Sequence, residues 1–343
     1  MKRVVGLLCA GIFTVLMFVG CGAAAPRRFQ YTYTDLFDTV TTFALYSTKQ
    51  EQADAWAAAL YERLLLFHRQ YSIYEDFDGV NNLKTVNDRA GQPVEVSDDL
   101  FNLLELCVKS YSLSDKKVNV AMGSVLQLWH TAREQGLREP AAAALPAEEA
   151  LRAAAQHCAI ENVQLDAAAK TVRLADTAMS LDVGAVAKGY ATARLAEYAA
   201  QCGMTDAIIS VGGNVVTVGD KYGQHFVIGI EDPQGKEPYA LRVRADNAAV
   251  VTSGSYQRYF TVNGKRYHHL IDPDTLYPAD FCASVTVIGA DAGMADMLST
   301  TLFLMPPEQG KKLLATVDGY EAVWILQDGT QIFSEKFEKY REL

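Results

Sequence analysis

Hydrophobic positions along the chain follow two periods, one typical of strands and one typical of helices. β-Branched and aromatic residues predominate from Thr39 to Tyr46, which predicts a strand. From Glu51 to Tyr71 apolar residues recur every three or four positions, which predicts an amphipathic helix. The stripe expected to face the core of that helix consists of Ala55, Ala59, Leu60, Leu64 and Phe67. The folded part of the chain should therefore include a strand followed by a long helix.

Polar stretches separate the next elements. Asp76 to Asn87 contains Gly79 and several asparagines, and predicts a loop. Ser97-Asp98-Asp99 combines an N-cap with an acidic first turn, and predicts a helix that continues to about Ser112.

Strands and helices continue to alternate in the second half. Ala178 to Asp182 predicts a strand and Ala187 to Gln201 a helix, and Ala292 to Met305 predicts another helix. Ala207 to Val218 predicts a continuous apolar strand. Gly212-Gly213-Asn214 interrupts it, and because glycine weakens a strand we expect a bulge or a close backbone approach there.

Asn263-Gly264 is the strongest hairpin signal in the chain. It lies between two strand-like runs, Tyr259 to Val262 and Arg266 to Leu270. Because side chains alternate along a strand, His268 and His269 should lie on opposite faces and cannot share one role.

Interleaved helices and strands are typical of α/β and α+β folds. The interleaving here predicts one of these two folds, built on a mixed sheet. The formal net charge is -10 and no dense run of Lys and Arg exists, so nucleic acid is excluded as a partner.

The N-terminal segment is typical of an export signal. Lys2 and Arg3 precede an apolar run that ends at Gly20-Cys21. Phe18 to Cys21 is similar to a bacterial lipobox, so we expect a lipoprotein signal peptide over residues 1–20 and a tether over 21–34. Cys21 would then carry the lipid anchor and the protein would be extracytoplasmic, attached to the bacterial membrane. An uncleaved membrane anchor is the alternative.

The stretch from Leu181 to Tyr190 is the first candidate for chemistry. It places Asp182, Gly184 and Lys188 where the expected strand gives way to a helix. A carboxylate, free backbone groups and an ammonium then converge within one helical turn, an arrangement suited to a phosphate ester. A strand-to-helix turn with glycine also serves packing alone, so this stretch leaves both interpretations open.

Further motifs follow in a fixed order. They are Ser210-Val-Gly-Gly-Asn214, Thr252-Ser-Gly-Ser-Tyr-Gln-Arg-Tyr-Phe260, His269-Leu-Ile-Asp-Pro273 and Ala295-Asp-Met-Leu-Ser-Thr300. Together with Leu181 to Tyr190, these motifs resemble the ApbE family, the FAD:protein FMN transferases. The resemblance extends over essentially the whole chain from about Phe37. It implies an α+β fold with a central mixed, largely antiparallel sheet flanked by helices, in one domain over residues 35–343.

The resemblance implies a magnesium-dependent enzyme with FAD as its substrate. Members cut the FAD pyrophosphate, attach the FMN half to a threonine or serine hydroxyl of an acceptor redox protein, and release AMP. Extracytoplasmic lipoproteins are usual in the family, in agreement with the N-terminal segment.

The resemblance also implies a role for individual residues. Asp296 and Thr300 lie one helical turn apart and, with the backbone carbonyl of Ala185, match the ligands of Mg²⁺. An Asp and a Thr near the start of a helix can also be no more than a cap. His269 matches the base that takes the proton from the acceptor hydroxyl, with His268 as an internal control of no expected role.

Several more residues stand at positions that contact FAD in the family, where Asn119 and Val40 depart from the usual residue. They are Asp182, Lys188, Gly212, Gly213, Asn214, Ser253, Gly254, Asn119 and Val40. Arg258 is either a phosphate partner or a solvated strand charge, and we favour the solvated charge. Asp272 is expected either to orient His269 or to cap the turn at Pro273.

Two other functions remain open at this point. An FAD pyrophosphatase would use the same metal site but let water attack, giving FMN and AMP. A non-enzymatic flavin-binding lipoprotein would need neither the metal ligands nor His269. The chain retains both, which argues against the binding protein. The sequence does not decide between water and an acceptor hydroxyl, and the resemblance favours the transferase.

Overall fold

A computed structural model describes residues 25–342, so the predicted signal peptide and Cys21 lie outside the described residues. Its largest element is an eight-stranded sheet of order β1-β2-β6-β7-β10-β13-β14-β15, in which every neighbouring pair is antiparallel. The strands are β1 (Arg27–Leu36), β2 (Thr39–Ser47), β6 (Ala207–Val211), β7 (Asn214–Val218), β10 (Ala249–Gly254), β13 (Ser284–Gly289), β14 (Glu321–Ile325) and β15 (Gln331–Phe333).

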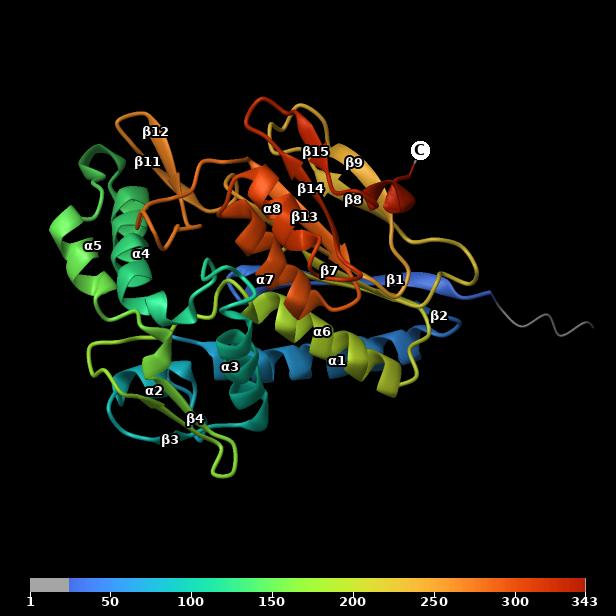
Figure 1. Ribbon diagram of the computed structural model, residues 1–343. Helices are drawn as coiled ribbons and strands as arrows, with labels where there is room; N and C mark the ends of the chain where they lie inside the picture. The colour runs from blue at the N-terminus through green and yellow to red at the C-terminus, as the bar shows by residue number, and fades with distance from the viewer. Residues whose placement is uncertain (1–24, 343) are drawn as a thin grey trace, which may run out of the picture.

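Eight α-helices are found over residues 25–342. They are α1 (Gln50–Tyr71), α2 (Leu83–Asp88), α3 (Asp98–Ser110), α4 (Gly123–Arg138), α5 (Glu148–Ala155), α6 (Ala187–Gln201), α7 (Ala292–Phe303) and α8 (Pro307–Leu314). Figure 1 shows α1, α6 and α7 together along one side of the large sheet, where α1 contacts β2 and α6 contacts β7. The predicted α+β fold is confirmed, with a sheet that is antiparallel throughout.

Three small sheets complete the fold. They are β3 (Val94–Glu95) with β5 (Thr171–Leu174) and β4 (Val163–Asp166), β8 (Val227–Glu231) with β9 (Tyr239–Arg244), and β11 (Tyr259–Val262) with β12 (Lys265–His268). The β11–β12 hairpin turns at Asn263 and Gly264, which have φ of 51° and 79°. These values are typical of the two-residue turn predicted from the sequence.

The central strands of the large sheet are buried on both faces. Val251 and Val287 belong to the core beneath α6 and α7, whereas their neighbours Val250 and Ile288 belong to a second core beneath β8 and β9. Side chains alternate between the two faces of a strand, so strands covered on both faces must be apolar at consecutive positions. The continuous apolar character of this part of the sequence has this origin.

Three predictions about local structure in the first half of the chain were wrong. In α1 the buried alanines are Ala53 and Ala57, and Ala55 is exposed. The second half of the predicted loop 76–87 forms α2, because the Asn82 side chain caps it by accepting a hydrogen bond from the Thr85 N–H. Residues 27–34, assigned to the tether, are part of β1 and pair with β2.

Candidate active site

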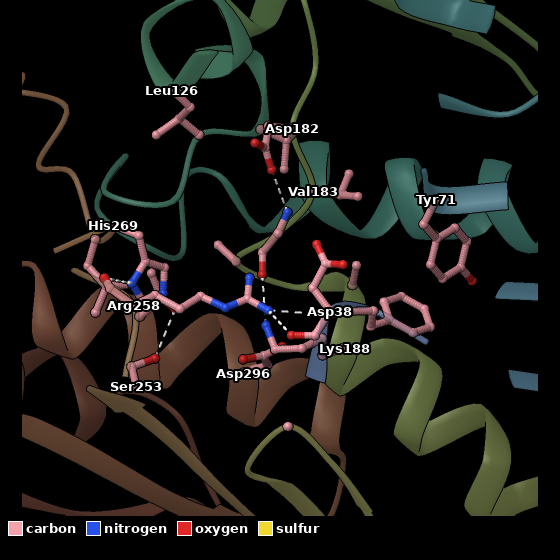
Figure 2. Close-up of a pocket in the computed structure, with 18 of the residues that line it drawn as sticks. Asp38, Tyr71, Leu126, Asp182, Val183, Lys188, Ser253, Arg258, His269 and Asp296 are labelled. Atoms are coloured by element: carbon pink, nitrogen blue, oxygen red, sulfur yellow. Dashed lines mark hydrogen bonds between the residues drawn. The ribbon is translucent and has the colours of Figure 1, made fainter. Parts of the chain in front are cut away.

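A cavity of about 300 Å³ lies where the β1–β2 turn, the start of α6, β10 and helix α4 meet, and Figure 2 shows part of its lining. This volume is at the lower end of the range for small-molecule sites. The predicted site residues that line it are Asn119, Asp182, Ala185, Lys188, Gly212, Asn214, Ser253, Gly254, His269, Asp296 and Thr300. The fold thus brings together side chains that are far apart in the sequence.

Two predicted FAD-contacting residues do not line the cavity. Val40 has a side chain that is 56% exposed, and its carbonyl accepts a hydrogen bond from the Gly212 N–H at 3.1 Å. Gly213 faces open space.

The Gly212-Gly213 segment is a hairpin turn and not a bulge in one strand. It joins β6 to β7, with Val211 paired to Asn214 and φ of 56° and 87° at the two glycines. Such values suit glycine, and a Cβ on Gly212 would lie 2.5 Å from Thr39 Oγ1. The turn leaves Asn214 almost fully buried with Oδ1 unpaired, at the cavity wall. A buried unpaired oxygen is costly, so Asn214 is suited to a ligand that donates a hydrogen bond.

The segment before Lys188 forms no strand, contrary to the prediction for Ala178 to Asp182, and residues 184–186 make a turn into α6. The side chain of Asn87 makes the hydrogen bonds to Leu181 that a neighbouring strand would otherwise make. Its Oδ1 accepts from the Leu181 N–H at 2.7 Å, and its Nδ2 donates to the Leu181 carbonyl at 3.0 Å. The Asp182 N–H donates to the Val120 carbonyl at 2.8 Å. Asp182 is thereby held at the cavity.

The start of α6 places a positive charge at the N-terminus of a helix, beside the Asp182–Gly184 turn. Lys188 Nζ donates to the Gly184 carbonyl at 3.2 Å, and Asp182 Oδ1 accepts from the Gly184 N–H at 2.8 Å. The N-terminus of a helix attracts anions, and Lys188 adds a full charge in its first turn. This wall of the cavity is suited to phosphate groups.

Asp296 and Thr300 lie one turn apart on α7, and both are buried. Asp296 Oδ2 accepts from the Gly189 N–H at 2.8 Å. Burial raises the pKa of Asp296 to about 6, against the opposing effects of the Lys188 charge and the Gly189 hydrogen bond. Thr300 Oγ1 lies 3.1 Å from Ser253 Oγ, which ties α7 to β10.

These residues fit a hard divalent cation. A carboxylate buried at the cavity wall with one protein hydrogen bond is undercompensated, and a cation there would offset its charge. The Thr300 hydroxyl lies on the same wall, as does Ala185 with its backbone carbonyl, so the donors are all oxygens, as Mg²⁺ prefers. Residues 25–342 contain no cluster of three His, Cys, Asp or Glu side chains that could hold a metal ion.

The His269 ring lines the cavity with a defined hydrogen bond. Its Nδ1 lies 3.3 Å from the Arg258 carbonyl, which accepts, so this nitrogen carries the hydrogen and Nε2 is left as the basic atom. Burial, followed by the charges of Lys188 and Arg258, lowers the pKa of His269 to about 3. The ring is therefore neutral at physiological pH and can accept a proton.

His268 does not line the cavity, in agreement with the opposite faces predicted for the two histidines. Its Nε2–H donates to the Ala279 carbonyl at 2.7 Å, and its Nδ1 accepts from the Leu270 N–H at 3.2 Å. The ring also packs edge-on against Phe303. The expectation of no role was incomplete, because His268 connects β12 to the segment around Ala279.

Arg258 was misjudged as a solvated strand charge. It lines the cavity, and its Nη2 donates to the carbonyls of Phe37 at 3.2 Å and Asp38 at 2.9 Å. Figure 2 shows the guanidinium directed at Asp38 across the pocket. Asp38 also lines the cavity, and the sequence analysis did not identify it.

A hydrogen-bonded aromatic pair lies beside Asp182, and its His130 was not identified from the sequence. Tyr74 OH lies 2.8 Å from His130 Nδ1, and His130 Nε2 lies 4.0 Å from Asp182 Oδ2. The carboxylate favours the tautomer with hydrogen on Nε2, so the Tyr74 hydroxyl donates to Nδ1. The helical period of α4 shows which residues share a face with His130, but it does not show that this face lines a cavity.

Asp272 does not contact His269. It accepts a hydrogen bond from the Asp274 N–H at 3.2 Å, which caps the turn at Pro273, and it forms an ion pair of 2.8 Å with Lys117. Of the two predicted roles, the structure favours the cap. Asn119 lines the cavity but uses its amide to cap Ala121 and to bond the Cys158 carbonyl.

Comparison with known proteins identifies relatives over nearly the whole chain. The model of the ApbE family matches residues 37–324. An FAD:protein FMN transferase of Treponema pallidum is 33% identical over 333 residues, covering 92% of this chain and 89% of the relative. One from Klebsiella pneumoniae is 35% identical over 269 residues, covering 76% and 81%.

Solved structures agree with these relatives. The ApbE protein of Thermotoga maritima superposes with a TM-score of 0.82 at 29% identity, covering 92% of this chain and all of that protein. The flavin transferase ApbE of Vibrio cholerae superposes with a TM-score of 0.76 at 22% identity, with the same coverage, and supports the fold alone.

Proposed function

This chain belongs to the ApbE family, and on that premise we propose that it is an FAD:protein FMN transferase. The reaction is transfer of the FMN half of FAD to a threonine or serine hydroxyl of an acceptor redox protein, with release of AMP. One observation carries the assignment to this site. Lys188, His269 and Asp296 come from three separate motifs, and all line one cavity.

The start of α6 provides the binding site for the FAD pyrophosphate. Lys188 faces the cavity as a positive charge and the first turn of the helix contributes its dipole. Both interactions strengthen as charge moves onto the leaving phosphate, so they favour the transition state over the bound substrate. Phosphoryl transfer depends chiefly on such positioning and neutralisation.

Asp296, Thr300 and the carbonyl of Ala185 would hold Mg²⁺. When bound there, Mg²⁺ would neutralise charge on the pyrophosphate. The buried Asp296 carboxylate and the all-oxygen donor set support this choice of ion.

His269 acts as the general base. Its Nε2 takes the proton from the acceptor hydroxyl while the hydroxyl oxygen bonds to the FMN phosphorus and the bond between that phosphorus and the bridging oxygen breaks. The electron pair of that bond leaves with AMP. The Nδ1 hydrogen bond to the Arg258 carbonyl holds the ring in the tautomer that this role requires.

Attachment to the membrane is part of the proposal. Cys21, at the end of the predicted signal peptide, would carry the lipid and place the enzyme on the outer side of the membrane. Within residues 25–342 no helix has the length and apolarity needed to cross a bilayer. The expected partner is an exported redox protein that carries FMN.

A mass spectrum tests the proposal. The protein is incubated with FAD, Mg²⁺ and an exported flavoprotein domain, and AMP is followed in parallel. A mass gain of one FMN on a threonine or serine of the acceptor supports the transferase. AMP and free FMN without a gain would identify a pyrophosphatase, and bound FAD without either product would identify a flavin-binding protein.

A further inference from the structure

The β1–β2 turn forms one wall of the cavity in an unfavourable backbone conformation. Phe37 and Asp38 make up the turn between Leu36 and Thr39, and have φ of 57° and 50°. A turn with both central residues at positive φ suits Asn-Gly, and it costs free energy for a bulky residue such as Phe. Contacts elsewhere must therefore hold the turn.

Two side chains from distant parts of the chain hold this turn. The Phe37 N–H donates to His68 Nδ1 at 3.2 Å, and the carbonyls of Phe37 and Asp38 both accept from Arg258 Nη2. Within residues 25–342 Arg258 has no ion pair with a carboxylate, so the turn carbonyls are the acceptors that its guanidinium uses. Hydrogen bonds from a charged donor are stronger than neutral ones.

The same arginine also lies next to the proposed base. Its own carbonyl accepts the hydrogen bond from His269 Nδ1, 3.3 Å away. One residue thus contacts the strained turn through its side chain and His269 through its backbone. If the turn moves, Arg258 is expected to move with it, and the hydrogen bond between the Arg258 carbonyl and His269 is expected to change.

We propose that Arg258 is a positioning residue of the flavin site. Its side chain holds the Phe37–Asp38 turn in place as part of the cavity wall. Because this inference rests on the proposed function, its test measures FAD binding separately from transfer. If the Arg258 side chain is removed, the turn relaxes toward an unstrained conformation and the wall of the cavity moves.

The test is a double-mutant cycle between positions 258 and 38, read by flavin fluorescence titration with FAD and by transfer kinetics. Arg258→Met should weaken FAD binding about ten-fold or more, the effect expected when a charge-assisted hydrogen bond is lost. Asp38→Gly added to Arg258→Met should restore part of that loss, because glycine adopts positive φ without penalty whereas aspartate does so at a small cost. Asp38→Ala should restore none, although it removes the same carboxylate.

Thermal unfolding of each variant shows whether the fold is intact. If Arg258→Met is destabilised, the comparison of Asp38→Gly with Asp38→Ala in that background still tests the inference. Equal FAD affinity in wild type and Arg258→Met would overturn it, as would equal rescue by glycine and alanine, which would assign the effect to the Asp38 charge. Failure of the wild-type protein to bind FAD or transfer FMN would instead reject the proposed function.

Discussion

The backbone N–H of Gly189 donates a hydrogen bond of 2.8 Å to Oδ2 of Asp296, and this bond joins the first turn of α6 to α7. It places the carboxylate proposed to bind Mg²⁺ against the residue that follows Lys188, the side chain proposed to bind the pyrophosphate. The two helices pack so closely here that a Cβ on Gly189 would lie 2.3 Å from the Ala292 carbonyl and 2.3 Å from Asp296 Cβ.

We expect Asp296→Asn to abolish transfer and to stabilise the metal-free protein. The substitution removes a buried charge while its amide oxygen still accepts from Gly189, so the free energy of unfolding should rise by about 1–3 kcal/mol. Melting temperatures measured with EDTA and with Mg²⁺ check this. Wild type should gain stability from Mg²⁺ and the variant should not, and an equal gain in both would remove Asp296 from the metal site.

The two adjacent histidines should separate chemistry from stability. His269→Ala removes the proposed base, so transfer should fall by about 10²–10⁴-fold with little change in melting temperature. His268→Ala leaves the Leu270 N–H and the Ala279 carbonyl unpaired and should cost about 1–3 kcal/mol of stability, while transfer at 25 °C changes little. Single-turnover rates and urea unfolding of both variants decide. Equal loss of transfer in the two would contradict the face assignment.

Local patterns in the sequence predicted much of the fold. The bounds of α6 and the β11–β12 hairpin follow from periodicity and from Asn263-Gly264, signals that lie within the segment concerned. The buried stripe of α1 was misassigned because several alanines are equally apolar. The packing of α1 against β2 and α6 decides that Ala53 and Ala57 face inward.

The site residues that escaped prediction depend on contacts between distant segments. Asn87 bonds Leu181 across 94 positions, and Arg258 bonds Asp38 across 220. No pattern in the sequence around Asn87 or Arg258 predicts which distant residue each of them bonds. Motif resemblance found the residues that the family shares, whereas the groups that hold those residues in place became visible only in the folded chain.

Acidification should destabilise the protein between about pH 7 and pH 5. Burial lowers the pKa of four histidines, His68, His130, His268 and His269, from their ordinary value of 6.5. In this range the unfolded chain binds more protons at these positions than the folded chain, so the free energy of unfolding falls with falling pH. Each net proton contributes at most about 1.4 kcal/mol per pH unit.

Asp296 opposes this trend, because burial raises its pKa to about 6 and the folded chain takes up that proton first. Four histidines outweigh one carboxyl group, so the net effect remains a loss. Urea unfolding at pH 7.5, 6.5 and 5.5 measures it, with His268→Gln as the comparison. The variant should start less stable and lose less on acidification. Parallel curves for the two proteins would show that His268 does not contribute.

Cys21 should determine where the protein resides in the cell. If the predicted lipobox is used, Cys21→Ser should prevent lipidation, since a serine cannot form the thioether. Membrane and soluble fractions of bacteria that express each form are compared by immunoblot, with Cys9→Ser as the control within the same apolar run. Wild type and Cys9→Ser should both sediment with membranes and carry the lipid mass. Lack of any lipid mass on the wild-type N-terminus would favour the uncleaved anchor.

Gly189→Ala tests whether the closeness of α6 and α7 is needed for metal binding. The added methyl group has no space between Ala292 and Asp296, so the helices must separate, at a cost of about 1–3 kcal/mol. Asp296 then moves away from Lys188, and the Mg²⁺ concentration that gives half-maximal transfer should rise. Gly293→Ala is the matched control, because it lies in the same pair of helices away from the cavity, and the nearest atoms to its new Cβ are Asp291 Oδ1 at 3.2 Å and Tyr190 Cα at 3.3 Å. An Mg²⁺ requirement unchanged by Gly189→Ala would mean that the metal does not depend on the contact between Gly189 and Asp296.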